Sequence, residues 1–350
     1  MFRIEDYKYE LPDRLIAQHP APSRDSSRLL LVDRGSKALR DHRFSELPHI
    51  LKPTDVLVVN NTRVVPARLI GSKASGGRVE ILVLEHEEYV PRTADQRWCL
   101  LKTSKRPKRG TRLYFARGAT GTVEELGEGG LARIRFDGYP LSPLIEEEGL
   151  MPLPPYIKRR PEDPRLDMDR ERYQTVFAKE EGAIAAPTAG LHFTDQVIEA
   201  LREKGVTLVE LTLHVGHGTF KPVRTSDIRN HRLGREFYSI GYEPAATINR
   251  AKGEDRRIIA VGTTVVRALE TAIGDDGRVK QGTGHTELLI TPGFTFRVID
   301  GLITNFHLPG SSLLFLVAAF AGLDLIKKAY AWAIEREYRF YSYGDAMLIL

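Results

Sequence analysis

The sequence predicts a discontinuous α/β domain, residues 1–65 and 151–350, that is interrupted by an inserted, barrel-like all-β domain at residues 66–150. Strand-like and helical stretches alternate after residue 151, as they do in a sheet covered by helices. Short apolar runs separated by glycine-containing turns fill residues 66–150, a pattern typical of a small barrel. The segment before residue 66 also ends in a strand-like run, so α/β-type sequence flanks the insertion on both sides.

The first segment contains helical signals at residues 11–18 and an apolar, β-branched run at residues 55–59. The apolar run stops abruptly at Asn60, Asn61 and Arg63. This pattern indicates a buried strand that delivers polar side chains to a site at its end.

The inserted segment predicts short strands that alternate with turns, and the last of them shows regular apolar–polar alternation. The runs are residues 79–84, 98–101, 112–115 and 131–136. Between the second and third runs, residues 102–112 contain six basic residues and no acidic residue. We refer to these residues as the basic loop.

The third segment predicts helices and strands in alternation. Thr194 can cap a helix over residues 195–204, and Gly205 ends it. The later elements are strands at residues 206–215 and 257–261, a helix at residues 265–273, an apolar helix at residues 313–320 and a terminal strand after residue 345. Strand–turn–helix units of this kind place ligands at the carboxyl ends of their strands.

The composition is that of a folded globular protein, with 42% hydrophobic and 28% charged residues. The single cysteine, Cys99, excludes an internal disulfide, an iron–sulfur cluster and a cysteine-based zinc site. We see no secretory signal, and the longest apolar run, residues 313–322, is too short to span a bilayer, so we expect a cytoplasmic protein. The net charge of +5 permits nucleic-acid binding without requiring it.

A run of small residues surrounds Pro187, Thr188 and Gly190 and ends at His192, just before the helix that Thr194 caps. Small residues let the backbone approach a ligand closely, and the free N–H groups of a helix start can hold an anionic group. The alternative is a tight core turn with a hydrogen-bonded histidine, and this segment alone does not decide between the two.

A glycine-rich loop at the end of a predicted strand contains His214 and His217. Two histidines three apart can ligate zinc, but on an extended strand they face opposite sides, and the sequence suggests no third ligand. We therefore predict no metal. The favoured interpretation is a loop that positions one histidine for proton transfer or substrate contact, with Gly216, Gly218 and Thr219 beside it.

Gly262 precedes Thr263, Thr264 and, one turn into the predicted helix, Arg267. Backbone N–H groups, hydroxyls and a guanidinium together suit a carboxylate or a phosphate. The alternative is a plain capped helix on which Arg267 and Glu270 pair at the surface, and the two interpretations are evenly matched.

Asn305 and His307 alternate on an extended segment, so we expect their side chains on the same side. Ser311 or Ser312 is the expected cap of the apolar helix that follows. Asp345, in the turn before the terminal strand, either orients a site residue or accepts hydrogen bonds from turn amides.

In their order along the chain, these segments resemble one family, the S-adenosylmethionine:tRNA ribosyltransferase-isomerases of queuosine biosynthesis. The resemblance covers nearly the whole chain and is weakest in the inserted β segment. Several independent motifs in one order are far more specific than a single glycine pattern. The motifs are residues 9–12, 15–18, 27–30, 59–69, 74–77, 151–157, 173–177, 187–193, 214–216, 218–220, 260–264, 304–309 and 338–347.

The resemblance implies a monomeric enzyme with a large α/β domain and an inserted β-barrel domain. It implies that the ribosyl part of S-adenosylmethionine is transferred to 7-aminomethyl-7-deazaguanine at the wobble position of tRNA and isomerised. The products are epoxyqueuosine-tRNA, adenine and methionine. S-adenosylmethionine would be a consumed substrate, so no cofactor is expected. The rival functions are a non-catalytic tRNA-binding module and a methyltransferase, whose glycine fingerprint is absent.

The implied reaction needs a base to remove a proton beside the sulfonium, a proton donor for adenine and anchors for a carboxylate. We expect His192 or His214 to be the base, with His307 as the next candidate. The start of the helix at Thr263, with Arg267, would anchor an anionic group. Asn60, Asn61 and Arg63 would line the same cleft.

The resemblance also makes the basic residues candidates for contacts with anticodon-stem phosphates. The alternative is a solvated charge run, which is common at loop tips. The candidates are Lys105, Arg106, Lys108, Arg109, Lys158 and Arg159.

Two departures from the family pattern limit what can be transferred. The family usually has a second histidine three residues after the one that matches His231, and here that position is Gly234. His217 falls at a position that the family leaves open, which argues against it as a catalyst.

Overall fold

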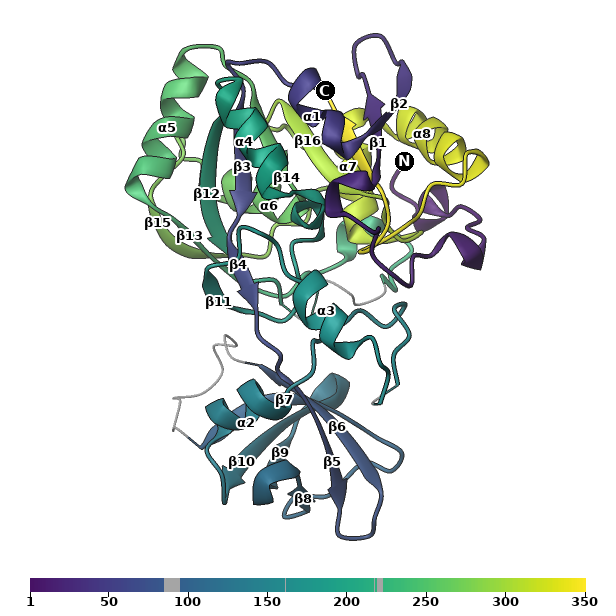
Figure 1. The fold of residues 1–350 in the computed structure, drawn as a ribbon, viewed down its shortest axis with the longest axis vertical. Coiled ribbons are helices and arrows are strands. Elements are labelled where there is room, and N and C mark those ends of the chain that lie inside the picture. The colour runs from purple at the N-terminus through teal and green to yellow at the C-terminus, as the bar shows by residue number, and fades with distance from the viewer. Residues whose placement is uncertain (85–94, 161, 217, 219–222) are drawn as a thin grey trace. The chain divides into compact units, whose positions relative to one another are not determined.

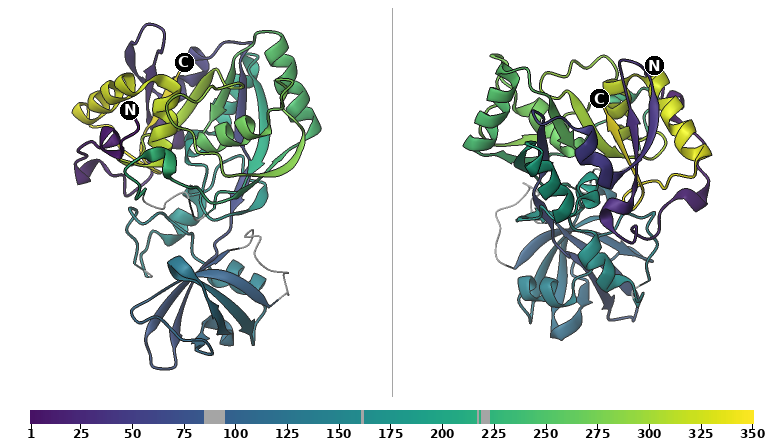
Figure 2. Two further views of the ribbon diagram at one scale, coloured as in Figure 1. Left: turned by 180° about the vertical axis from the view of Figure 1, so that it is seen from behind. Right: turned by 45° about the horizontal axis from the view of Figure 1, so that its top comes forward.

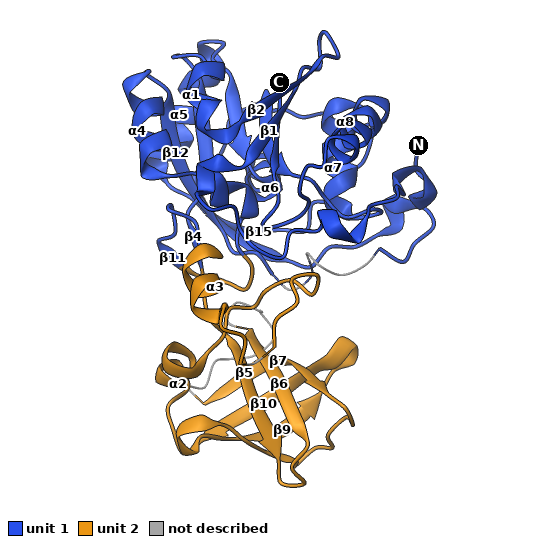
Figure 3. Cartoon of the chain, turned by 45° about the vertical axis from the view of Figure 1, so that its right-hand side comes forward, with its two compact units in different colours: residues 1–63, 174–180, 186–350 blue, residues 64–173, 181–185 orange. Residues whose placement is uncertain are grey.

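The structure, a computed structural model, describes residues 1–84, 95–160, 162–216, 218 and 223–350. It contains two compact units, coloured separately in Figure 3. Unit 1 holds a mixed sheet with helices and unit 2 holds a closed barrel, so the predicted fold class is confirmed. Unit 1 consists of Met1–Arg63, Gln174–Glu180 and Ala186–Leu350, and unit 2 of Val64–Tyr173 and Glu181–Ala185.

Unit 1 is built on a nine-stranded sheet with the order β15-β13-β12-β3-β14-β16-β17-β1-β2 (Figure 1). The four central strands β12, β3, β14 and β16 are parallel, and β17 runs antiparallel to β16. The strands are β1 (Arg28–Val32), β2 (Leu39–Arg43), β3 (Val56–Asn60), β12 (Thr207–Leu213), β13 (Glu236–Ile240), β14 (Ile258–Val261), β15 (Gly282–Thr286), β16 (Gly301–Asn305) and β17 (Ala346–Ile349).

Two helices of unit 1, α4 and α7, begin at the caps that the sequence predicts. The Thr194 hydroxyl accepts a hydrogen bond from the Val197 N–H at 3.2 Å, and the Ser311 hydroxyl accepts one from the Leu314 N–H at 3.3 Å. Both predicted caps are therefore confirmed. The helices are α1 (Leu47–Ile50), α4 (Asp195–Glu203), α5 (Tyr242–Gly253), α6 (Thr263–Ala272), α7 (Ser312–Ala321) and α8 (Leu323–Glu335).

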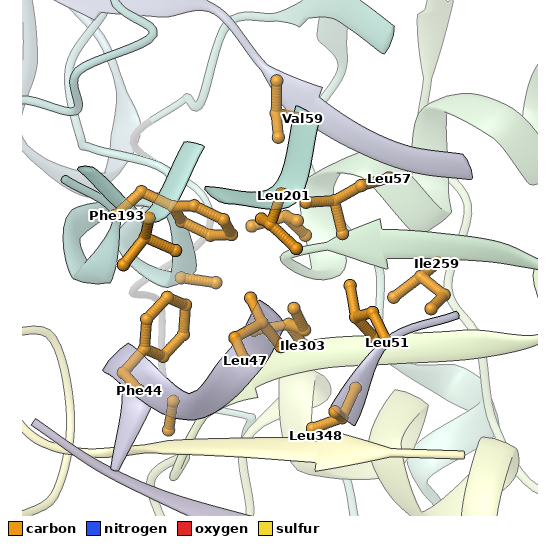
Figure 4. Close-up of a cluster of buried hydrophobic side chains, with 14 of the residues drawn as sticks. Phe44, Leu47, Leu51, Leu57, Val59, Phe193, Leu201, Ile259, Ile303 and Leu348 are labelled. Carbon is orange, nitrogen blue, oxygen red and sulfur yellow. The ribbon is translucent and has the colours of Figure 1, made fainter. Parts of the chain in front are cut away.

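One face of the sheet forms the main hydrophobic core with α1 and α4 (Figure 4). Leu57 and Val59 of β3 point to this face and pack with Leu47 and Leu201 of the helices. Burial of each such side chain contributes about 1.5–3 kcal/mol, so this layer fixes the sheet firmly against its helices. The alternate residues of β3 point to the other face, where α6 contacts β3, β12 and β14.

The two C-terminal helices, α7 and α8, pack on each other, and α8 also contacts β1. They are the yellow and yellow-green helices in both views of Figure 2. The last strand, β17, returns to the interior of the sheet between β16 and β1. Within the described ranges, no helix is long and apolar enough to cross a membrane.

The helical signals at residues 11–18 were misleading. The structure has only a 3-10 turn, Asp13–Leu15, after Pro12. The following residues are extended, and Ile16 forms a parallel bridge with Phe340. Backbone hydrogen bonds to a distant segment therefore prevail over the local helical preference.

Unit 2 is a closed barrel in which every strand pair is antiparallel, and α2 (Leu141–Glu148) packs its apolar side chains against the barrel core. Two strands, β5 and β9, were not predicted, because Gly71 and Gly121 interrupt their apolar patterns. A Cβ on Gly71 would lie 2.6 Å from the Tyr114 carbonyl oxygen of the neighbouring strand. The strands are β5 (Arg68–Lys73), β6 (Arg78–Leu84), β7 (Gln96–Thr103), β8 (Arg112–Tyr114), β9 (Thr120–Leu126) and β10 (Leu131–Asp137).

We expected the α/β segment to resume at residue 151, but unit 2 continues to Tyr173. This stretch contains α3 (Leu166–Arg172) and contributes no strand to the large sheet. Outside both the large sheet and the barrel, β4 (Thr62–Val64) and β11 (Glu180–Ala183) form a two-stranded sheet.

Candidate functional site

The candidate site lies where the parallel strands of the large sheet have their carboxyl ends. We call this side of the sheet the carboxyl edge. The parallel strands β12, β3, β14 and β16 all end there, and β17 and β1 begin there because β17 is antiparallel to β16. The short helix η7 (Thr188–His192) contacts β16. This edge therefore gathers the predicted residues of unit 1 that follow or precede these strands: Asn60, Asn61, His214, Gly216, Thr263, Thr264, Asn305, His307 and Asp345.

Small residues allow η7 to pack closely. Ala189 and Gly190 are buried, and a Cβ added to Gly190 would lie 3.0 Å from Cγ2 of Thr175. Pro187, which precedes the helix, is also buried, whereas Thr188 remains partly exposed. The segment is thus a tight turn that leaves one hydroxyl-bearing residue accessible.

His192 is buried at the end of η7, with an exposed fraction of 4%. Its Nδ1 lies 2.7 Å from the Ser27 hydroxyl, and its Nε2 lies 3.1 Å from Nδ2 of Asn305. Its ring stacks on Phe44 with a centroid distance of 5.1 Å. Both ring nitrogens are therefore engaged inside the protein.

The neighbours of His192 fix its tautomer. The Asn305 amide nitrogen also donates to the Tyr341 carbonyl oxygen at 3.1 Å, which settles the orientation of the amide. Nε2 of His192 must then accept, so Nδ1 carries the proton and donates to Ser27. Burial, together with the positive charges of Arg339 and Arg24, lowers the pKa of His192 to about 3. The ring is neutral at neutral pH.

His214 follows β12, and its Nδ1 lies 2.8 Å from the Thr62 hydroxyl. Its ring stacks on Phe237 with a centroid distance of 5.6 Å, and its backbone N–H donates to the Phe237 carbonyl oxygen. These contacts set the plane of the imidazole at the carboxyl edge.

His307 lies two residues beyond β16, which ends at Asn305. Its Nε2 lies 2.8 Å from the Thr304 hydroxyl. Its backbone is held by two tyrosines: the N–H donates to the Tyr330 hydroxyl, and the carbonyl oxygen accepts from the Tyr9 hydroxyl. Burial lowers the pKa of His307 to about 3.

Asn60 and Asn61 tie β3 to β12. The Asn60 side chain donates to the Leu213 carbonyl oxygen at 2.9 Å and accepts from the Leu213 N–H at 3.0 Å. The Asn61 carbonyl oxygen of the side chain accepts from the Thr212 hydroxyl at 2.8 Å. Both residues lie at the predicted edge, where their described hydrogen bonds join the ends of neighbouring strands.

Helix α6 starts at the carboxyl edge directly after Gly262, which has φ 93°. The start has no side-chain cap, so its first N–H groups are not satisfied by a capping side chain. Thr263 is buried, and the Thr264 hydroxyl accepts a hydrogen bond from the Asn60 side chain at 3.3 Å.

Arg267 forms a buried ion pair with Glu236 of β13, whose other carboxylate oxygen accepts from the Gly216 N–H at 2.9 Å. The surface pair of Arg267 with Glu270 that we considered is absent, because Glu270 accepts hydrogen bonds from the N–H groups of residues 297–299. Nη2 of Arg267 is buried and has no hydrogen-bond partner in the described part of the chain.

Asp345 joins its turn to β1. Its carboxylate oxygens accept from the backbone N–H of Arg28, the first residue of β1, at 2.9 Å and of Arg339 at 2.7 Å. The side chain is 2% exposed.

Of the candidates in the glycine-rich loop after β12, His217 and Thr219 lie outside the described residues. Gly218 lies beside Gly234, since a Cβ on Gly218 would be 3.3 Å from the Gly234 backbone nitrogen. Arg63 is exposed on β4. Among the residues that the structure describes, no group of three histidine, cysteine or acidic side chains could hold a metal ion.

The basic candidates belong to unit 2. The exposed side chains of the basic loop between β7 and β8 include Lys105, Arg106, Lys108 and Arg109. Lys158 is also exposed. Arg159 differs, because its guanidinium forms a bidentate ion pair with Asp169 in which each side chain is 1% exposed. This placement does not favour a role for Arg159 in phosphate contact.

Sequence reasoning missed three residues that hold the candidate histidines and Arg267. Thr62 contacts His214, Ser27 contacts His192 and Glu236 pairs with Arg267. Ser27 and Thr62 lie within family motifs, and nothing else in the sequence pointed to them as functional residues. Glu236 had none, because its partner lies 31 residues away in the chain.

Comparisons with known proteins place the chain in a family. The chain matches the family described as "Queuosine biosynthesis protein" over residues 4–349. It is 50% identical to the S-adenosylmethionine:tRNA ribosyltransferase-isomerase of Syntrophotalea carbinolica over 349 residues, which cover 99% of this chain and 100% of that protein. The protein of the same name from Geobacter metallireducens is 48% identical over 349 residues, 99% of each chain.

Among solved structures, the chain is similar to the crystal structure of S-adenosylmethionine tRNA ribosyltransferase from Thermotoga maritima. The identity is 35%, the TM-score is 0.55, and the match covers 99% of this chain and 100% of that one. The similarity therefore includes both the α/β and the barrel segments. The chain belongs to the queuosine biosynthesis protein family.

Proposed function

We propose that this chain transfers the ribosyl part of S-adenosylmethionine to 7-aminomethyl-7-deazaguanine at the wobble position of tRNA and isomerises it. The products are epoxyqueuosine-tRNA, adenine and methionine. The observation that carries the proposal is the full-length similarity to enzymes of that name, at 50% identity over 349 residues. The gathering of polar motifs at the carboxyl edge supports it, because α/β sheets bind ligands there. S-adenosylmethionine is consumed, so the proposal includes no separate cofactor and no metal.

We assign the general base to His214. The positive sulfonium acidifies the adjacent 5′ carbon, and a base with a pKa near the working pH removes that proton best. His192 and His307, with pKa values of about 3, do not meet this condition. His214 is held at the carboxyl edge by Thr62. Loss of adenine, attack by the amine of the modified base and closure of the epoxide with departure of methionine follow.

The start of α6 is the proposed anchor for the methionine carboxylate. The N–H groups at Thr263 and Thr264 lack a capping side chain, and a helix start favours negative charge. Arg267 contributes less positive charge than the sequence suggested, because Glu236 neutralises it.

The basic loop and Lys158 are the proposed contacts with tRNA phosphates. Four exposed cations within five residues give an electropositive loop, which attracts a polyanion over about a Debye length. We also propose that the protein acts in the cytoplasm and as a monomer. Sedimentation of the protein alone and with tRNA tests the monomer, and a dimer would contradict it.

Product analysis tests the proposed function. The protein is incubated with S-adenosylmethionine and a tRNA that carries the deazaguanine, and the products are identified by mass spectrometry. Release of adenine and methionine is expected. S-adenosylhomocysteine would indicate a methyltransferase instead, and tRNA binding without turnover would indicate a binding module. A tRNA with unmodified guanine at the wobble position is the matched control and should give no epoxide product.

Alanine variants of His192, His214 and His307 test the assignment of the base. Adenine release should fall most for His214→Ala, by about 10²- to 10⁴-fold. Near-normal turnover of that variant would rule out His214 as the base without affecting the proposed overall reaction.

A further inference from the structure

The polar groups around η7 form one continuous chain of hydrogen bonds within unit 1. The Thr188 hydroxyl donates to Oδ1 of Asn305 at 2.9 Å. Nδ2 of Asn305 donates to Nε2 of His192 at 3.1 Å, and Nδ1 of His192 lies 2.7 Å from the Ser27 hydroxyl. Ser27 in turn donates to the Arg24 carbonyl oxygen at 3.1 Å. We call this series the η7 relay.

Two backbone carbonyl groups fix the direction of every proton in the η7 relay. A carbonyl oxygen can only accept, so Ser27 donates to Arg24 and Asn305 donates to Tyr341. The Asn305 side-chain oxygen then has only acceptor capacity, and the Thr188 proton must point towards it. The relay is therefore a fixed arrangement rather than a set of rotating hydroxyls.

The fixed direction of the protons matters at Thr188, which is the accessible end of the η7 relay. Ser27, His192 and Asn305 are buried, whereas Thr188 is partly exposed at the carboxyl edge. Because its proton is directed inwards, the Thr188 oxygen presents only lone pairs outwards. A ligand group that meets it must be a hydrogen-bond donor.

The charge around the relay selects the kind of donor. Arg24 donates to the Leu191 carbonyl oxygen at 3.2 Å, and Arg339 lies near Asp345 at the same edge. Both guanidinium groups act on His192 as positive charges. Arg339 is paired with Asp345, so the charge of Arg24 is the main reason why a neutral hydroxyl is favoured there over a cationic ammonium.

We propose that the Thr188 oxygen accepts a hydrogen bond from a ribose hydroxyl of S-adenosylmethionine, and that Ser27, His192 and Asn305 are positioning residues that hold it as a pure acceptor. This inference rests on the proposed function for the identity of the ligand. It assigns His192 a positioning role through its fixed tautomer and gives Ser27 a role that its sequence motif did not suggest.

The test combines changes in the protein with changes in the ligand, as a double-mutant cycle does. Affinities of S-adenosylmethionine and of its 2′-deoxy and 3′-deoxy analogues are measured by calorimetry for the wild type, Thr188→Ser and Thr188→Val. In the wild type and in Thr188→Ser, loss of one of the two hydroxyls should weaken binding about 2- to 10-fold. Thr188→Val should bind S-adenosylmethionine more weakly by a similar factor and should not distinguish the analogues.

Ser27→Ala tests the distant end of the relay. The variant removes the partner of the His192 Nδ1 proton, so the ring keeps only its hydrogen bond with Asn305 and is held less firmly. The discrimination between ligand and deoxy analogue should then decrease although Thr188 is intact. If Ser27 has only a structural role, its replacement should lower the affinity for all three ligands equally.

The inference is overturned if Thr188→Val shows the same deoxy penalty as the wild type, or if neither analogue binds more weakly to the wild type. The wild-type product assay keeps the two proposals separate. If the wild type releases adenine and methionine but the cycle shows no coupling, only this inference fails. If the wild type neither releases these products nor binds S-adenosylmethionine, the proposed function fails and this inference with it.

Discussion

Nδ2 of Asn305 lies 3.1 Å from Nε2 of His192, and this one contact changes the role that the sequence suggested for the histidine. The amide holds Nε2 as an acceptor, and the Ser27 hydroxyl holds Nδ1. A histidine with both nitrogens engaged and a pKa of about 3 is poorly suited to remove a proton from a substrate at neutral pH.

Replacement of His192 by Gln should therefore reduce adenine release only moderately. The Gln amide can replace one of the two hydrogen bonds, so we expect a loss of about 10-fold, against about 10²- to 10⁴-fold for loss of a general base. Adenine release by His214→Gln should fall by the larger factor. A loss of that size in His192→Gln would identify His192 as the base.

The two buried histidines also predict how stability depends on pH. His192 and His307 have pKa values of about 3 in the folded state, against about 6.5 when exposed in the unfolded chain. Between these values the unfolded chain binds protons that the folded chain does not, so unfolding is favoured as pH falls. Their stabilising contribution is complete above about pH 6.5 and decreases towards pH 3.

Denaturant unfolding between pH 4 and 8 measures this effect. Each histidine should add a slope of up to about 1.4 kcal/mol per pH unit to the free energy of unfolding. His307→Gln should reduce the pH slope of the free energy of unfolding by the contribution of one histidine. An unchanged slope in both His192→Gln and His307→Gln would contradict the prediction.

The sequence predicted which residues gather at the carboxyl edge better than it predicted what each residue contacts there. Asn60, His214, Thr263 and Asn305 were found because polar residues follow apolar strands, and parallel strands bring their ends together. Their partners could not be found in this way. The contact of Ser27 with His192 joins residues 165 positions apart, and only the completed sheet brings them together.

The failures have the same origin. Residues 11–18 have a helical pattern, but their backbone pairs with Phe340, which local preference cannot reveal. The same limit applies to the roles of Asn60 and Asp345, whose side chains satisfy backbone groups near strand ends. A polar residue at a strand end can thus build the edge of a site, and sequence alone does not distinguish that role from contact with substrate.

The buried pair of Arg159 and Asp169 should be a major determinant of unit 2 stability. Asp169→Asn would leave a guanidinium buried without its counter-charge, which should cost about 3–5 kcal/mol. In a Trp332→Phe background, fluorescence of Trp98 reports unfolding of unit 2 alone. The exposed pair of Arg117 and Glu148 gives the matched control, and Glu148→Gln should have little effect. Equal stability of the two variants would contradict this prediction.

Neutralisation of the basic loop should weaken tRNA binding and its dependence on salt together. Each phosphate contact contributes about 0.7–0.9 to the slope of log affinity against log salt concentration. Replacement by Gln of all four exposed cations should lower the slope by up to about 3, because not every cation need reach a phosphate. The four residues are Lys105, Arg106, Lys108 and Arg109.

The matched control for this variant is the double replacement of Lys327 and Lys328, which are exposed on α8 and outside the proposed contact. It removes charge from the surface without altering the basic loop, so its salt slope should stay close to that of the wild type. Filter binding across a range of salt concentrations measures both slopes. If the two variants lose the same slope per charge, the effect is one of net charge, and the basic loop has no specific role. A loss confined to the loop variant requires direct phosphate contact, since screening alone acts on both surfaces equally.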